Sequence, residues 1–181
     1  MKTNNKQLNK IMLFWDLVIL SLGIALDQWT KVLATRFLKA QPAIPVIKDI
    51  LELDYVENRG AAFGVLQGKR IYFLVIAAVV FFLFAWLLLK LPPEKKYQKL
   101  HIALSFILAG AVGNTIDRGL NGYVVDFVYF KLINFPVFNV ADIFITVTTI
   151  WLAILLLFFF KEDDFDFLRR RPEQEKDNEN K

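Results

Sequence analysis

The chain has 181 residues, of which 56% are hydrophobic, and a formal net charge of +4. This composition is more apolar than that of a soluble domain of the same length, and the length fits one compact domain. There is no cysteine and a single histidine, His101, so disulfides, thiolate nucleophiles and cysteine-ligated zinc are excluded. Lys and Arg gather between the apolar runs and at both ends. We interpret them as loop charges facing anionic headgroups, not as a nucleic-acid surface.

Four apolar runs predict an α-helical membrane protein with four transmembrane helices. The expected spans are residues 11–28, 71–89, 100–116 and 140–160. The first run starts with lysines but lacks an A-x-A-like site near its end. We therefore expect a retained helix and not a cleaved signal peptide. The third run is rich in small residues (Ala109, Gly110, Ala111 and Gly113), which allow helix backbones to approach closely in lipid.

The distribution of basic residues predicts the orientation of the chain. Lys95, Lys96 and Lys99 lie between the second and third runs, and three arginines follow the fourth. Both termini are therefore predicted to be cytoplasmic, with residues 29–70 and 117–139 outside. The segment Asp27–Arg70, which includes the first connection, weakens this signal, because it mixes seven Lys or Arg with five acids. Residues 1–160 are expected to form one membrane-embedded domain, and residues 161–181 a charged, partly disordered cytoplasmic tail.

The first connection is expected to contain structure of its own. Pro42 and Pro45 break any continuing helix, Ile47–Tyr55 has the alternation of an amphipathic strand, and Asn58–Gly64 has the glycines of a turn. This connection predicts a small β-sheet on the outer membrane surface. The segment around Asp126 is separately predicted to be a strand or a tucked loop.

Ionisable residues at the ends of membrane spans are the default candidates for function. With the predicted orientation, five of them fall on the outer side: Asp27, Asp117, Arg118, Asp126 and Asp142. Each also has a simpler explanation as a solvated interface residue. Asp27 and Lys31 form an i,i+4 pair that supports a helix, Asp142 is a favourable charge in a first helical turn, and Asn139 is a possible N-cap. His101 is interpreted as an interface residue on the cytoplasmic side.

The functional hypothesis places Asp126 and Asp142 face to face. One carboxylate then takes a proton from water, while the other stays protonated and hydrogen-bonds the electrophile, because nearby like charges separate their pKa values. Asn114 and Arg118 share a helix face and form a possible donor pair. The Asn58 amide, followed by small residues, is a hydrogen-bonding handle for a substrate backbone.

Five motifs in order resemble those of bacterial lipoprotein signal peptidase, also called signal peptidase II. They are Asp27-Gln-Trp-Thr-Lys31, Asn58-x-Gly-Ala-Ala-Phe63, Gly113-Asn-x-x-Asp-Arg118, Gly122-x-Val-x-Asp-Phe127 and Phe138-Asn-x-Ala-Asp142. Any one of them is weak, but five in this order between four apolar runs are specific. The resemblance extends from about residue 11 to 160, and Arg59 and the tail fall outside its pattern.

The resemblance implies an aspartic endopeptidase of the bacterial cytoplasmic membrane, with its active site near the outer face. It would remove signal peptides from prolipoproteins, cutting on the N-terminal side of a cysteine that carries diacylglycerol. Asp126 and Asp142 would be catalytic, without metal or cofactor, in a chain expected to act as a monomer. The implied supporting and substrate-binding residues are Asp27, Asn58, Gly60, Asn114, Arg118 and Asn139. The competing classes are a small transporter or channel, which needs charges deep within its spans, and a structural membrane adaptor.

Overall fold

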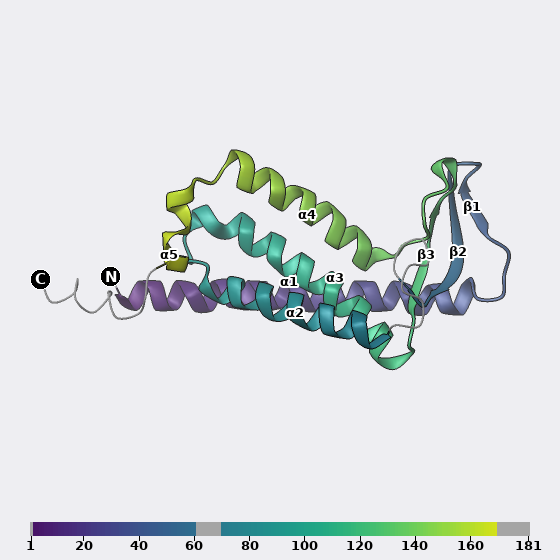
Figure 1. The fold of residues 1–181 in the computed structure, drawn as a ribbon, viewed down its shortest axis with the longest axis horizontal. Helices are drawn as coiled ribbons and strands as arrows, with labels where there is room; N and C mark the ends of the chain where they lie inside the picture. Colours follow the sequence, from purple (N-terminus) through teal and green to yellow (C-terminus); the bar gives the residue numbers. More distant parts are fainter. Residues whose placement is uncertain (1, 61–69, 170–181) are drawn as a thin grey trace, which may run out of the picture.

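The computed structural model of the chain describes residues 2–60 and 70–169. Four long helices run along the molecule, a three-stranded sheet lies at one end, and the N-terminus and the short α5 lie at the other (Figure 1). The elements are α1 (Lys2–Phe37), β1 (Ile44–Ile47), β2 (Leu51–Asn58), α2 (Arg70–Lys90), α3 (Gln98–Leu120), β3 (Val124–Phe130), α4 (Val140–Phe158) and α5 (Asp166–Arg169). Short 3-10 turns are η2 (Lys95–Tyr97), η3 (Lys131–Ile133) and η4 (Glu162–Phe165).

Within residues 2–60 and 70–169, three helical segments are long and apolar enough to cross a membrane: Gln7–Phe37, Lys95–Leu120 and Val140–Phe158. They correspond to the first, third and fourth predicted spans, and α2 contains a shorter apolar segment, Leu74–Lys90. Helix α1 continues beyond residue 28, the predicted end of the first span, to Phe37. No Gly or Pro interrupts the chain between Gly23 and Pro42, so nothing in the backbone stops the helix there.

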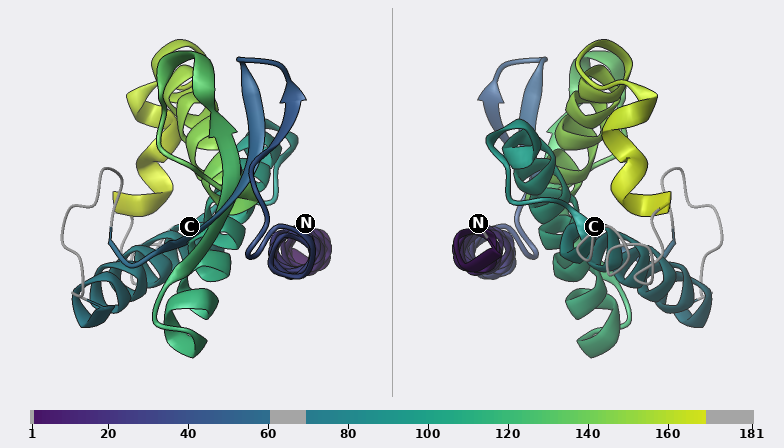
Figure 2. Two further views of the ribbon diagram at one scale, coloured as in Figure 1. Left: turned by 90° about the vertical axis from the view of Figure 1, so that its right-hand side faces the viewer. Right: turned by 90° about the vertical axis from the view of Figure 1, so that its left-hand side faces the viewer.

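Helix α3 is the centre of the bundle, with α1 and α2 on either side of it when the molecule is seen from its end (Figure 2). It also packs on α4. The small residues of α3 allow these approaches. A Cβ added to Gly110 would lie 2.5 Å from the carbonyl oxygen of Ala141, and one added to Gly113 would lie 2.4 Å from Asp27 Oδ2. The predicted role of these small residues in close helix packing is thus confirmed.

The sheet is antiparallel, with the strands in the order β1–β2–β3. The predicted single strand Ile47–Tyr55 is wrong, because the chain turns between β1 and β2. Asp49 adopts a φ of 61° in this turn, a left-handed conformation that Asp tolerates better than most residues. The sheet rests on the end of α1, where Val125 and Phe127 pack against Ala34 and Leu38. This packing fixes β3, and with it Asp126, relative to the helices.

The end of the molecule opposite the sheet has its own apolar cluster, formed by Leu91, Tyr97, Leu100, Leu104 and Leu155. Phe165 and Phe167 pack against it, and the Tyr97 hydroxyl donates a 2.7 Å hydrogen bond to the carbonyl oxygen of Asp164. The expectation of a tail without apolar packing is therefore wrong for residues 161–169, and the rest of the tail lies outside the described residues.

The sequence had indicated that His101 lies at the membrane interface. This prediction is wrong, because His101 lies buried between α1 and α3. Its side chain is 3% exposed, and its Nδ1 atom is 2.8 Å from Asp16 Oδ2. Ser105, one turn further along α3, donates a 3.2 Å hydrogen bond to Asp16 Oδ1. Because 85 residues separate Asp16 from His101 in the sequence, local patterns could not pair them.

Candidate active site

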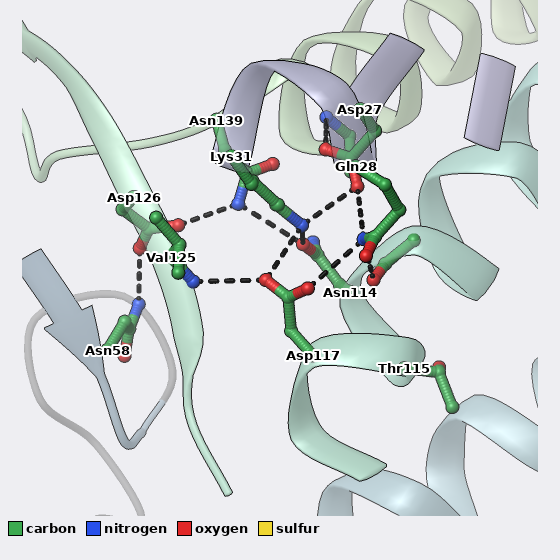
Figure 3. Close-up of polar contacts among 12 residues, drawn as sticks. Asp27, Gln28, Lys31, Asn58, Asn114, Thr115, Asp117, Val125, Asp126 and Asn139 are labelled. Atoms are coloured by element: carbon green, nitrogen blue, oxygen red, sulfur yellow. Dashed lines mark hydrogen bonds and ion pairs between the residues drawn. The ribbon is translucent and has the colours of Figure 1, made fainter. Parts of the chain in front are cut away.

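Asp126 projects from β3 into the junction between the sheet and the helix ends (Figure 3). It is 2% exposed. Its Oδ2 atom accepts a 2.9 Å hydrogen bond from Asn58 Nδ2, and its Oδ1 atom accepts a 2.6 Å hydrogen bond from Asn139 Nδ2. Burial raises the pKa of Asp126 to about 7, the hydrogen bond from Asn58 opposes the rise, and the nearby Asp142 carboxylate adds to it. This acid therefore holds its proton far above the usual range of aspartate.

Asp142 lies in the first turn of α4 and takes part in a capping box with Asn139. The backbone amide of Asp142 donates to Asn139 Oδ1 at 3.0 Å, and the backbone amide of Asn139 donates to Asp142 Oδ2 at 3.1 Å. The other carboxylate oxygen, Oδ1, accepts a 2.8 Å hydrogen bond from Asn114 Nδ2. Both simple interpretations, the N-cap and the first-turn charge, are confirmed, but the same residues also contact Asp126.

Asn139 connects the two carboxylates. Its backbone amide binds Asp142, and its side-chain Nδ2 donates to Asp126 and, at 3.1 Å, to Asn114 Oδ1. Asn139 has no exposed surface, so its hydrogen bonds are shielded from water. Within the described residues no direct hydrogen bond joins Asp126 to Asp142; the Asn139 amide group links them. Two carboxylates from separate elements, β3 and α4, therefore belong to one hydrogen-bonded unit.

Asn58, Gly60 and Arg118 lie on the side of the site formed by the end of β2. The Gly60 amide donates to Asn58 Oδ1 at 3.0 Å, which turns the NH₂ group of Asn58 toward Asp126. Arg118 Nη2 donates to the Gly60 carbonyl oxygen at 3.3 Å, so α3 holds the chain immediately after β2. The remainder of the predicted turn, residues 61–64, lies outside the described residues.

Asp27 is buried, with no exposed surface. Its Oδ1 atom accepts a 3.0 Å hydrogen bond from the amide of Ala141 at the start of α4. The supporting residues implied by the sequence motifs (Asp27, Asn58, Gly60, Asn114, Arg118 and Asn139) thus come together around Asp126 and Asp142.

Three further residues, Lys31, Gln28 and Asp117, belong to the same network. Of these, the sequence named only Asp117 as a functional candidate, and it gave no role in the site to Lys31 or Gln28. Lys31 Nζ lies 2.9 Å from Asp27 Oδ2, 3.1 Å from Asp117 Oδ2 and 2.9 Å from Asn114 Oδ1. Gln28 Nε2 donates to Asp27 Oδ2, to Asp117 Oδ1 and to the carbonyl oxygen of Gly113, at 3.1, 3.0 and 3.1 Å. One sequence signal could have identified Gln28 and Lys31. Asp27, Gln28 and Lys31 are polar residues close together at the end of an apolar helix, and an i,i+4 pair that supports the helix does not explain all three.

The hydrogen bonds to Asp126 and Asp142 described above come from amide groups, three of side chains and one of the backbone. Across residues 2–60 and 70–169, no group of three or more His, Asp or Glu side chains is placed to hold a metal ion. Asp126 and Asp142 are carboxyl groups, which are able to take up and release protons.

Residues 19–158 match a family model described as Signal peptidase (SPase) II. That range contains both carboxylates and every residue of the network around them. The chain belongs to the signal peptidase II family. Members of this family cleave signal peptides from prolipoproteins, and the chain is accordingly a membrane protease. The family resemblance inferred from the five motifs is confirmed.

Curated relatives and solved structures agree with this assignment. The lipoprotein signal peptidase of Caldanaerobacter subterraneus subsp. tengcongensis is 49% identical over 143 residues, covering 78% of this chain and 95% of the relative. That of Brevibacillus brevis is 47% identical over 146 residues, covering 81% of this chain and 95% of the relative. A bacterial membrane enzyme solved by the in meso method at 2.3 Å resolution superposes with a TM-score of 0.71 at 31% identity. That superposition covers 87% of this chain and 92% of the other.

Proposed function

We propose that Asp126 and Asp142 are the catalytic pair of an aspartic endopeptidase that acts on prolipoproteins whose cysteine carries diacylglycerol. The bond cleaved is the one on the N-terminal side of that cysteine. The observation that carries the proposal is the hydrogen-bonded unit in which Asn139 links Asp126 and Asp142. A linked pair of carboxylates, one with its pKa raised to about 7, is the arrangement that acid–base hydrolysis of a peptide bond requires.

The pair can carry out hydrolysis with one shared proton. The ionised carboxylate takes a proton from water as the water oxygen attacks the scissile carbonyl carbon, and the protonated carboxyl donates a hydrogen bond to the carbonyl oxygen. The tetrahedral intermediate then collapses, the carbon–nitrogen bond breaks, and the leaving nitrogen receives a proton from the pair. One water is consumed, and the pair returns to its starting protonation state.

The proposed membrane arrangement has four spans, with both termini in the cytoplasm and the site at the outer face. Helix α2 has 21 residues. At a rise of 1.5 Å per residue it is about 31 Å long, which is close to the thickness of the hydrocarbon core. Lys90, Lys95 and Lys99 lie around the α2–α3 connection, at the end of the molecule away from the sheet (Figure 1). That distribution supports a cytoplasmic location for this end.

One copy of the chain is proposed to be sufficient for activity. Both carboxylates and the amides that bind them come from the same chain. The substrate is proposed to approach from the membrane, since the diacylglyceryl group and the apolar part of a signal peptide both reside in lipid.

The test is to replace each aspartate separately by asparagine in purified protein. Asp126→Asn and Asp142→Asn are each expected to lower the rate of cleavage of a lipidated prolipoprotein by at least about a thousandfold. Asp49→Asn is the matched control, because Asp49 lies in the turn between β1 and β2 with its side chain 72% exposed.

The same substrate without diacylglycerol should not be cleaved by the wild-type protein. A folded Asp126→Asn or Asp142→Asn variant with near-wild-type turnover would refute the catalytic assignment. Equal cleavage of both substrates would refute the lipid requirement alone.

A further inference from the structure

Lys31, Asp27 and Asp117 form a buried cluster, here called the Lys31 cluster, next to the proposed catalytic pair. Their side chains are 3%, 0% and 4% exposed. The ammonium group of lysine has three donors, and here it contacts Asp27 Oδ2, Asp117 Oδ2 and Asn114 Oδ1. Each of the three donors therefore has a partner on α1 or α3.

The two acids of the Lys31 cluster also bind backbone amides in other elements. Asp27 Oδ1 accepts from the amide of Ala141, at 3.0 Å, and Asp117 Oδ2 accepts from the amide of Val125, at 3.1 Å. Ala141 and Val125 are the residues that directly precede Asp142 and Asp126 in the chain. Lys31 thus binds two carboxylates, those of Asp27 and Asp117. Each carboxylate in turn fixes the backbone amide of the residue that directly precedes one of the two proposed catalytic aspartates.

The third partner of Lys31 fixes a side chain instead of a backbone. An ammonium group only donates hydrogen bonds, so the Asn114 atom that faces Lys31 is the amide oxygen. The NH₂ group of Asn114 is thereby directed to Asp142 Oδ1, at 2.8 Å. Without the lysine, the Asn114 oxygen would keep only the 3.1 Å hydrogen bond from Asn139 Nδ2. The NH₂ group of Asn114 would then be held toward Asp142 less firmly, and an amide turned the other way would present its oxygen to an ionised carboxylate and repel it.

We infer that Lys31 is a positioning residue that sets the geometry of both Asp126 and Asp142 through Asp27, Asp117 and Asn114. This inference depends on the proposed function, since it concerns the geometry of the proposed pair. Lys31 also has a second effect, through its charge. Its positive charge lowers the pKa of Asp126, against the stronger effect of burial and against the Asp142 carboxylate. The charge of Arg118 also interacts with Asp126 and Asp142.

The first experiment compares Lys31→Met with Lys131→Met in nanodiscs. Lys131 is the matched control, because it too contacts two carboxylates, Glu52 at 2.7 Å and Asp49 at 3.8 Å, but is 44% exposed on the sheet. Lys31→Met is expected to lower kcat by about a hundredfold, the typical cost of a misplaced reacting group. KM should change little, and the alkaline limb of the pH profile of kcat should move to higher pH. Lys131→Met should leave all three unchanged.

Lys31→Arg separates geometry from charge. The planar guanidinium group keeps the positive charge but cannot direct its donors to the three partners of an ammonium group. We expect kcat to remain low, as in Lys31→Met, while the alkaline limb stays near its wild-type position. If Lys31 served only to stabilise the fold, the Met and Arg variants would not differ in the position of the alkaline limb while sharing a low kcat.

A charge-balanced variant covers the case in which Lys31→Met does not fold. The double variant Lys31→Met with Asp27→Asn removes one charge of each sign, and the asparagine oxygen can still accept from the Ala141 amide. It is expected to fold and to show the same loss of kcat. Folding of each variant is checked by its melting temperature and by circular dichroism.

The inference is overturned if any folded variant lacking Lys31 keeps kcat within about threefold of wild type. It is also overturned if kcat falls in Lys31→Met while its pH profile stays in place. In either case Asp126→Asn tells the two proposals apart. An inactive Asp126→Asn protein leaves the catalytic pair intact as a proposal, whereas an active one removes the pair and the role of Lys31 with it.

Discussion

Asn139 fulfils two functions with one side chain, and the sequence indicated both without showing how they connect. Its Oδ1 atom caps α4 by accepting from the amide of Asp142, and its Nδ2 atom donates to Asp126 and Asn114. A cap requires only an oxygen at this position, which Ser and Asp also provide. The presence of an amide NH₂ group is therefore explained by Asp126, not by the helix.

Asn139→Ser and Asn139→Ala separate the two functions of this residue. Serine retains the cap but not the bridge to Asp126, so we expect little loss of stability and a fall in kcat of about a hundredfold or more. Alanine loses both, and about 1 kcal/mol of stability as well. The measurements are the melting temperature and kcat of each purified variant. A serine variant with wild-type kcat would show that the bridge is dispensable.

The raised pKa of Asp126 predicts a bell-shaped pH dependence of cleavage. At low pH both carboxylates are protonated and no base remains to activate water. As pH rises through about 7, the shared proton is lost, so kcat should fall on this alkaline limb. The two limbs belong to the coupled pair. The measurement is kcat against pH in nanodiscs, and a flat profile up to the pH of unfolding would contradict a shared-proton mechanism.

The free energy of unfolding should also depend on the protonation of Asp126, and the raised pKa determines whether stability rises or falls with pH. Asp126 has a folded-state pKa of about 7 against an ordinary value of 3.8, so between these values the folded state binds more protons than the unfolded state. The contribution of Asp126 to stability is therefore fully present below about pH 4 and is lost as pH rises through about 7. Controls for the pH profile must measure unfolding at each pH for this reason.

At the level of elements, the sequence predicted the helices well and the first connection less well. Long apolar runs identify helices because length and composition suffice for them. The turn between β1 and β2 escaped detection because Ile47, Leu51 and Leu53 lie at alternate positions on both sides of it, and the single polar Asp49 interrupts that pattern only once. The left-handed conformation of Asp49 depends on pairing of β1 with β2, which local pattern does not contain.

The segment after α4 was the other element that the sequence misrepresented. The segment is highly charged, so the packing of Phe165 and Phe167 was not predicted. Their partners on η2 and α3 lie more than 60 residues earlier in the sequence, where a local pattern cannot indicate them. Tyr97 is the centre of this packing, with its ring 5.6 Å from that of Phe167 in an edge-to-face arrangement and 5.8 Å from that of Phe160. The start of the predicted tail is thus part of the folded protein.

Phe167→Ala should lower the stability of the protein without affecting its chemistry. Phe167 is half-buried, and the loss of its apolar contacts and of the ring pair with Tyr97 should cost about 2 kcal/mol. Phe158→Ala is the matched control, since that ring is 76% exposed and should cost less than about 0.5 kcal/mol. Thermal unfolding in detergent measures both, and equal melting temperatures for the two variants would mean that the packing contributes nothing.

At the level of the whole molecule, the sequence motifs located the site because polar residues at the ends of apolar helices are rare and costly. Six supporting residues and both carboxylates were named from these motifs, and they do meet in space. Lys31 and Gln28 were not recognised, because a pair at i,i+4 on one helix has a sufficient local explanation. Their partner Asp117 lies on another helix, and only the packing of α1 on α3 gives the cluster its full set of contacts.

The proposed orientation can be tested with single cysteines, because the chain contains none. Lys48→Cys lies on the exposed turn beside the sheet, and Lys95→Cys lies in the exposed connection at the other end. A membrane-impermeant maleimide applied to intact spheroplasts should label the first and not the second, because only the sheet end is expected to face outward. Lysed membranes should label both. Labelling of Lys95→Cys from outside would mean that the orientation is inverted.

The position of Asp142 within the chain has a consequence for biosynthesis. The two carboxylates come from β3 and from the first turn of α4, and the linking amide immediately precedes that helix. A nascent chain that stops before residue 139 contains every earlier element but only half of the proposed pair, and its Asp126 lacks the hydrogen bond from Asn139. Under the proposed assignment of the catalytic pair, the protein is therefore expected to become active only when its last long helix docks, and truncated products are expected to lack proteolytic activity.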